Sequence, residues 1–257
     1  MFCYKIPQFE KKHLLRVEML EQLRDFPRDY LEILYSGYSD GIVCGCTPGW
    51  AQGKLSIEPG ILRYKGNLYF LKEPFILTCT AQDKIRYLKV QFLPTVKENG
   101  ILMGKTRIYL DDIAPNFVSE IELCEFRLQD GARLRDTYEN FADCITEFDT
   151  IHLLNVPWAS PGRPTIHPKV LRQYAVEILN KKNRESVDTS FAIGILTNGG
   201  VMPEEAVRAY IDARTGGKTA KGNKGLYDGL AEIIRISGTD VSAQKTASET
   251  RRQVMLF

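Results

Sequence analysis

The chain has 257 residues, of which 44% are hydrophobic and 26% are charged, so it can bury one large core or two to three smaller ones. Its formal net charge of +2 is close to balance and selects neither nucleic acid nor an acidic surface as a partner. The first residues lack a secretion signal, and no apolar run approaches the roughly 18 residues of a membrane span, which predicts a protein made in the cytoplasm without membrane contact.

An amphipathic helix is predicted at the start of the chain. Residues 9–25 place apolar side chains at helical spacing, and Leu15, Met19 and Leu23 fall on one face. Pro27 interrupts this pattern, and a shorter helical piece follows it and ends near Gly37. Residues 1–38 are therefore interpreted as a broken helix. Its apolar face either packs on the neighbouring domain or contacts another subunit, and the pattern leaves both open.

Residues 39–154 change to a period of two, which is typical of β-strands. Short alternating runs are separated by turn signals at Pro59-Gly60 and Lys65-Gly66-Asn67. Within residues 119–131 the apolar face changes after Leu123, as a β-bulge would require, and the acidic residues of this run are assigned to the solvent side of a strand. These features predict an antiparallel β-domain, either a small sandwich or a barrel.

The last third of the chain is predicted to be helical. Residues 155–168 hold four prolines and are interpreted as a linker or a loop packed across a surface. Four helical segments follow in residues 169–238 and predict a helical bundle, and residues 239–257 are expected to form a mobile tail. The predicted fold class is α+β, with an N-terminal helix, a small antiparallel β-sandwich or barrel, and a C-terminal helical bundle.

The sequence contains no recognisable catalytic or metal-binding motif. Its six cysteines lack paired zinc spacing, and its three histidines are isolated from one another. The glycine-rich loop at 214–225 lacks the first glycine of a phosphate-binding loop, because position 212 is an aspartate. We therefore expect no catalytic residue, no cofactor and no metal. A hydrolase whose two acids are brought together only by the fold stays open.

One segment of the β-domain resembles a known class of proteins. The stretches "YSDGIVCGC" and "LSIEPGILRYKGNLYFL" are similar to a segment of tail and baseplate proteins from phages, prophages and phage-tail-like particles of Gram-positive bacteria. The matching residues are Asp40, Gly41, Ile42, Gly45, Pro59, Gly60 and Gly66. In those proteins the segment builds a small β-domain whose glycines shape hairpins at subunit contacts. The resemblance implies assembly rather than catalysis.

The expected function is therefore that of a structural component of a phage or prophage tail, a baseplate or a related tail-like particle. The expected partners are further copies of the chain and other tail or baseplate subunits. The protein would reside in the bacterial cytoplasm on synthesis and then in a virion or tail-like particle. The residues assigned to assembly are Leu15, Met19, Leu23, Pro59, Gly60, Gly66 and Tyr69.

The alternative hypothesis is a binding module for a glycan or a nucleic acid. It would use the β-domain together with the basic loop at 214–225, although the balanced net charge argues against nucleic acid. Its candidate contacts are Trp50, Tyr64, Trp158, Lys218, Lys221 and Lys224. The competing interpretation of the aromatic residues is that they are buried in the core, since aromatic side chains are mostly buried for their area.

Overall fold

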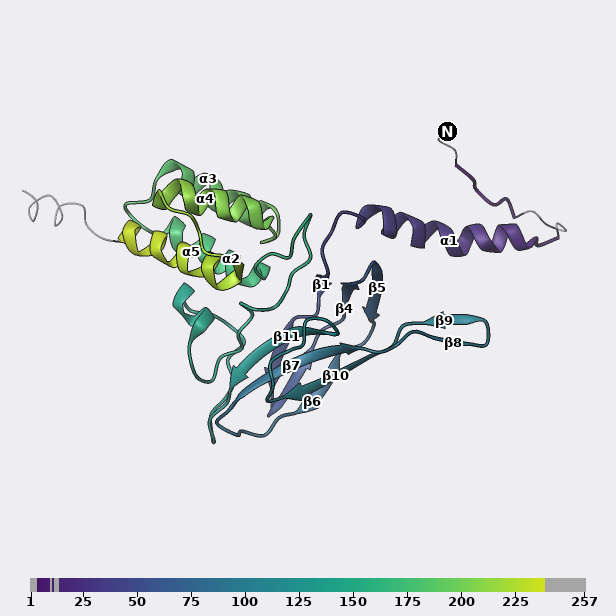
Figure 1. Cartoon of the computed structure of the whole chain (residues 1–257), viewed down its shortest axis with the longest axis horizontal. Coiled ribbons are helices and arrows are strands. Elements are labelled where there is room, and N and C mark those ends of the chain that lie inside the picture. Colours follow the sequence, from purple (N-terminus) through teal and green to yellow (C-terminus); the bar gives the residue numbers. More distant parts are fainter. Residues whose placement is uncertain (1–3, 10, 12–13, 239–257) are drawn as a thin grey trace, which may run out of the picture.

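The computed structural model describes residues 4–9, 11 and 14–238. It combines an N-terminal helix, several small antiparallel sheets and a group of C-terminal helices, which confirms the predicted α+β fold class (Figure 1). The tail predicted at 239–257 lies outside the described residues. None of the described helices has the length and apolar character that a transmembrane segment needs.

The N-terminal helix α1 spans Val17–Leu34 as one continuous helix. The predicted break at Pro27 is wrong, as is the predicted start at residue 9. Pro27 cannot donate the backbone hydrogen bond that the carbonyl group of Leu23 would accept. Both residues are exposed, so water can satisfy that carbonyl group and the helix can continue.

The described chain contains four antiparallel sheets. The first has the strand order β1 (Gly41–Gly45), β4 (Gly60–Tyr64) and β5 (Asn67–Leu71). The second has the order β2 (Pro48–Ala51), β3 (Lys54–Ile57) and β6 (Phe75–Thr78). The third has the order β10 (Thr106–Asp111), β7 (Ile85–Phe92) and β11 (Glu120–Arg127). The fourth is a hairpin of β8 (Val96–Glu98) and β9 (Ile101–Met103).

The register of β11 confirms the predicted bulge. Its pairing with β7 shifts between Glu122 and Cys124, so consecutive residues there stop alternating between the two faces. The assignment of the acidic residues of this strand to solvent is wrong for two of them, because Glu120 is 8% exposed and Glu122 only 1%. Glu120 is paired with the buried Lys89, whereas Glu122 is not.

The proline-rich segment at 155–168 is packed across β1. The backbone nitrogen of Ile42 donates to the carbonyl oxygen of Pro157 at 2.8 Å, and the nitrogen of Ala159 donates to the oxygen of Ile42 at the same distance. A side chain at Gly41 would collide with this segment, because its Cβ would lie 2.5 Å from the oxygen of Pro157. The segment therefore fixes the β-domain against the helices that follow.

Four helices follow this segment: α2 (Pro168–Leu179), α3 (Ser186–Thr197), α4 (Glu204–Thr215) and α5 (Gly222–Gly238). These helices contact the preceding part of the chain through the short 3-10 helix η1 (Phe141–Ile145). The ring of Phe141 stacks on Tyr227 of α5 at 4.6 Å and meets Tyr174 of α2 edge-on. The core of the helices is therefore continuous with that of the sheets.

Candidate functional site

The helix α1 exposes an extended apolar surface. Figure 1 shows this helix projecting from the body of the protein, and none of its residues is buried. Leu23 is 54% exposed, Phe26 71% and Ile33 75%. Of the three α1-region residues predicted for assembly, Leu15 and Leu23 are exposed and Met19 is half-buried. The body of the same chain therefore leaves this apolar surface largely uncovered.

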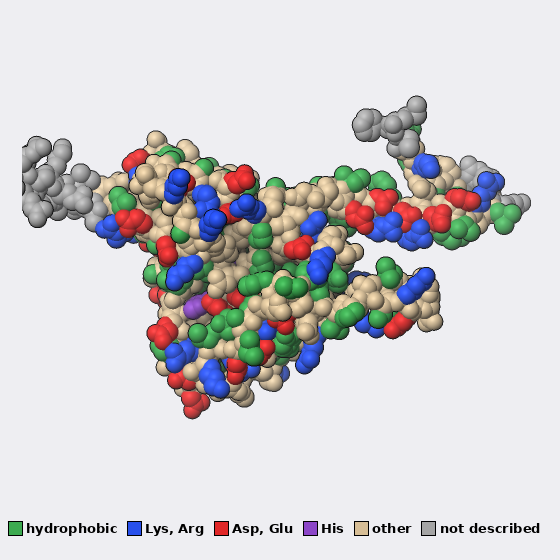
Figure 2. Space-filling model, in the orientation of Figure 1, with side chains coloured by type: hydrophobic (Ala, Val, Ile, Leu, Met, Phe, Trp, Pro, Cys, Tyr) green, Lys and Arg blue, Asp and Glu red, His purple; other side chains and the backbone are tan. Residues whose placement is uncertain are grey.

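The opposite face of α1 is charged and internally paired. Arg24 donates to Asp25 at 2.6 Å, and Arg28 lies 3.2 Å from Asp25 and 3.8 Å from Glu32. Figure 2 shows the resulting row of acidic and basic side chains along the helix. Arg24, Arg28 and Glu32 are exposed and Asp25 is partly exposed, so each pair adds little stability. They make one side of the helix polar and leave the apolar residues on the other side.

A second arm projects from the same end of the molecule. The β8–β9 hairpin extends beyond the third sheet in the direction in which α1 extends (Figure 1). Its tip exposes Ile101 and Leu102, at 61% and 73%. Sequence reasoning did not single out this arm, although the Asn99-Gly100 turn between two short apolar runs is a hairpin signal.

The hairpin of β4 and β5 carries the other residues predicted for assembly, Pro59, Gly60, Gly66 and Tyr69. Gly60 is packed within its own chain, because a Cβ atom there would lie 2.4 Å from the backbone nitrogen of Cys46. Gly66 lies in the turn with φ of +80° and open space around it. Tyr69 is half-buried edge-on to Phe92. The turn and the exposed Phe70 of β5 are thus accessible parts of this hairpin.

The aromatic residues of the alternative hypothesis do not form one surface. The ring of Tyr64 stacks on Phe92 with centroids 3.7 Å apart, and its hydroxyl donates to the carbonyl oxygen of Val118 at 2.5 Å. Trp158 is 9% exposed and packs edge-on against His167. Trp50 is half-buried. Tyr64 and Trp158 are thus engaged with different rings of their own chain, which argues against a shared stacking platform of these residues.

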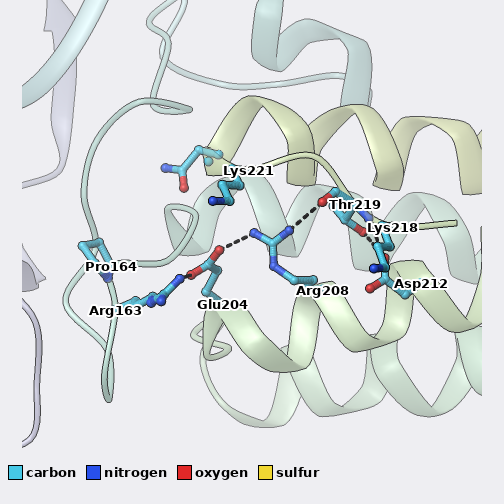
Figure 3. Close-up of a pocket in the computed structure, with 10 residues that line it drawn as sticks. Arg163, Pro164, Glu204, Arg208, Asp212, Lys218, Thr219 and Lys221 are labelled. Carbon is cyan, nitrogen blue, oxygen red and sulfur yellow. Dashed lines mark hydrogen bonds and ion pairs between the residues drawn. The ribbon is translucent and has the colours of Figure 1, made fainter.

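The basic loop forms a cavity of about 610 Å³ with the proline-rich segment (Figure 3). Lys218 and Lys221 line it, whereas Lys224 lines a separate cavity beside His152 and Tyr227. The three lysines predicted to contact a phosphate backbone are therefore divided between two sites.

Internal contacts fix the loop that bears Lys218 and Lys221. Arg208 forms an ion pair with Glu204 and donates to the carbonyl oxygen of Thr219 at 2.8 Å. Asp212 accepts hydrogen bonds from both the backbone nitrogen and the hydroxyl of Thr219, and these lower the pKa of its carboxyl group. The cavity has a positive rim, and its acidic groups are already engaged with the chain itself.

The described residues contain no metal-binding cluster, and two of the described cysteines are buried away from thiol chemistry. No three histidine, cysteine or acidic side chains among residues 4–9, 11 and 14–238 converge closely enough to hold a metal ion. The described cysteines are free thiols, and burial raises the pKa of Cys46 and Cys144 to about 12. At neutral pH these two thiols stay protonated and are poor nucleophiles.

Comparison with known proteins gives distant structural matches alone. No protein family and no curated protein sequence matches the chain. A crystal structure of TssK aligns with 93% of this chain and 70% of its own, at 11% identity and a TM-score of 0.40. A chain of the TssK-TssF-TssG baseplate subcomplex of the type VI secretion system, solved by cryo-electron microscopy, aligns with 90% of this chain and 99% of its own, at 11% identity and a TM-score of 0.38.

Proposed function

We propose that this chain is a structural subunit of a phage or prophage tail, a baseplate or a related tail-like particle, and that it assembles through α1 with further copies of itself and with other subunits. The observation that carries the proposal is the unpartnered apolar face of α1. At TM-scores of 0.40 and 0.38, the likeness to the baseplate proteins named above adds no weight. The particle type rests on the resemblance of residues 38–71 to tail and baseplate proteins.

The physical chemistry of α1 supports the need for a partner. Helices in water are stabilised mainly by packing of their apolar face, and α1 buries none of its residues. Its interior Pro27 weakens it further, since a proline inside a helix costs about 3 kcal/mol relative to alanine. A helix of this kind gains most of its stability when another surface covers it.

The spacing of the apolar residues indicates what that surface is. The residues Met19, Leu23, Phe26, Tyr30 and Ile33 alternate steps of four and three positions, which is the seam of a coiled coil. Such a seam is best covered by another helix with the same spacing, and a second copy of the chain supplies one. Most soluble oligomers are closed assemblies of identical subunits, and twofold-symmetric dimers are the commonest of them.

Light scattering coupled to size-exclusion chromatography tests this proposal on the full chain. We expect an oligomer for the native chain and a monomer for the double variant Leu23→Asp, Phe26→Asp, with an unchanged melting temperature. The matched control is Glu18→Gln, Glu21→Gln on the charged face, which should stay oligomeric. A chain that begins at Ser39 should also be monomeric. A monomeric native chain would contradict self-assembly.

A further inference from the structure

A second recognition feature lies between the third sheet and the beginning of α5. It is a cavity of about 380 Å³, here named the acidic pocket, and it is lined by Tyr87, Phe117, Glu122, Glu125, Asn155 and Asn223. These residues come from β7, from the loop between β10 and β11, from β11, from the proline-rich segment and from α5. Five parts of the chain therefore converge on one small space.

The acidic pocket contains a buried carboxyl group with one unpartnered oxygen. Glu122 is 1% exposed, and its Oε1 atom has no hydrogen-bond partner among the described residues. Burial and the nearby charge of Glu125 raise the pKa of Glu122 to about 8. A buried polar group without a hydrogen bond is costly, so such groups in folded proteins call for a specific explanation.

The neighbouring groups add to the negative character of the pocket. Oε1 of Glu125 accepts a hydrogen bond from the amide nitrogen of Asn155 at 3.3 Å and lies 3.8 Å from Nδ1 of His152. Within the described chain, no lysine or arginine forms an ion pair with Glu122 or Glu125, although Lys224 lines the adjoining cavity beside Glu125. Two carboxyl groups thus share a cavity that lacks a matching cation.

The loop that contributes Phe117 to the pocket exposes large apolar side chains. Phe117 is 68% exposed, and its neighbours Ile113 and Val118 in the same loop are 72% and 73% exposed. The loop therefore presents three large apolar side chains to solvent beside an acidic interior. Arginine is enriched at protein interfaces, and the residues that contribute most binding energy sit in well-packed, desolvated pockets.

We propose that the acidic pocket receives an arginine or lysine side chain from another subunit of the assembly, with the apolar neighbours of that side chain packing on Phe117 and its loop. The inference deepens and rests on the proposed assembly function. The partner is a protein segment in which a basic residue stands between apolar ones. The incoming cation would supply the charge and hydrogen bonds that Glu122 lacks in the isolated chain.

The test is an NMR-monitored titration of the full chain at pH 8.5 with the peptide acetyl-Leu-Arg-Leu-amide. We expect saturable binding that Glu122→Gln weakens at least tenfold and that the exposed matched control Glu73→Gln leaves unchanged. The peptide with citrulline in place of arginine, which has nearly the same shape but no charge, should bind at least tenfold more weakly. No binding, or equal binding by Glu122→Gln, would overturn the proposal.

Two further experiments identify the source of the cation. Acetyl-Ser-Arg-Ser-amide should bind at least threefold more weakly than the leucine-flanked peptide, and equal affinity would assign the pocket to a free cation instead of a protein segment. Glu122→Gln should have the same oligomeric state as the native chain. If the variant instead loses its ability to oligomerise, the basic side chain that enters the pocket comes from a second copy of this chain. The peptide titration does not require an oligomer, so peptide binding by a monomeric chain would keep the pocket and overturn self-assembly alone.

The pH dependence of binding provides an independent readout. The titratable groups around Glu122 are Tyr87 and Lys89 on β7, Cys124 and Glu125 on β11, His152 beyond Glu125, and Lys224 and Asp228 on α5. Lys89 is opposite Glu122 in the strand register, but its ammonium group is paired with Asp111 and Glu120. Burial raises the pKa of Tyr87 and of Cys124, so both stay protonated up to pH 9. Because Glu122 ionises near pH 8, affinity should rise about tenfold from pH 7 to pH 9. Glu122→Gln should show no such rise, and an equal rise in this variant would overturn the assignment to Glu122.

Discussion

The helices α1 and α2 have the same kind of sequence but opposite surroundings. Both place apolar side chains along one face, yet α1 buries none of its residues, whereas α2 buries six of twelve. The apolar face of α2 is covered by other parts of the chain, including α3, η1 and α5. An amphipathic pattern therefore indicates that one face of a helix is to be buried. It does not indicate whether the same chain or a partner buries that face.

The largest expected difference between α1 and the buried C-terminal helices concerns their ion pairs. Asp188 in the first turn of α3 is completely buried and accepts hydrogen bonds from Nε of Arg214 and from the hydroxyl of Tyr210, both at 2.7 Å. Removing one partner of a buried pair leaves the other unpaired, so Asp188→Ala should lower the free energy of unfolding by about 3–5 kcal/mol in urea denaturation. Asp25→Ala on α1 should cause no measurable change. Equal effects would show that the two regions do not differ in burial.

The next comparison uses one leucine from each helix. Leu171 of α2 is completely buried, so Leu171→Ala should cost about 2–5 kcal/mol through lost packing and a residual cavity. Leu23→Ala on α1 should leave the denaturation midpoint unchanged at concentrations where the chain is monomeric. The same variant should weaken association in sedimentation velocity, an effect that Leu171→Ala cannot produce without also lowering stability. A large loss of monomer stability in Leu23→Ala would show that α1 packs on its own chain.

A third prediction concerns burial that does not stabilise. The pKa of Glu122 is about 8 in the folded chain against an ordinary value of 4.5, so the unfolded state releases this proton first as the pH rises. The contribution of this group to the free energy of unfolding is fully present below about pH 4.5 and is lost progressively as the pH rises to about 8. At pH 8.5, Glu122→Gln should therefore have a free energy of unfolding about 1–3 kcal/mol higher than that of the native chain and should unfold at a higher urea concentration.

This difference should shrink at pH 5, where the native carboxyl group is protonated in the folded state. Melting curves of both proteins at the two pH values provide the measurement. A variant that is less stable than the native chain at pH 8.5 would mean that Glu122 already has a partner within the chain.

Much of the architecture could be predicted because it depends on local patterns. The alternation of Leu55 and Ile57 and the turn at Lys65-Gly66 predicted strands that the structure contains. The extent of α1 could not be predicted, because the cost of Pro27 in an exposed helix depends on whether water reaches the Leu23 carbonyl. That information lies in the tertiary surroundings rather than in the pattern.

One of the two candidate sites could be predicted from the sequence and the other could not. The apolar stripe of α1 was visible in the sequence, since an amphipathic period is a local property. The acidic pocket was not, because Glu122 alternates with Ile121 and Leu123 as a solvent-facing strand residue would. Only the covering of that face by the 112–118 loop and the start of α5 makes the position buried. Burial of one face by distant segments leaves no signal in the strand itself.

The smallest effect on overall stability, and the sharpest test of the comparison, comes from Pro27. Replacing it with alanine restores a backbone donor in the middle of α1 and removes a local cost of about 3 kcal/mol. If α1 is a separate arm, Pro27→Ala should slow amide hydrogen exchange within Val17–Leu34 and raise the helical circular dichroism signal, while the urea midpoint of the body stays constant. A midpoint that rises together with the helical signal would mean that α1 unfolds as one cooperative unit with the sheets, and its apolar face would then belong to the core of this chain. A constant midpoint leaves α1 as the element whose stability depends on assembly, because its free energy is not shared with the rest of the fold.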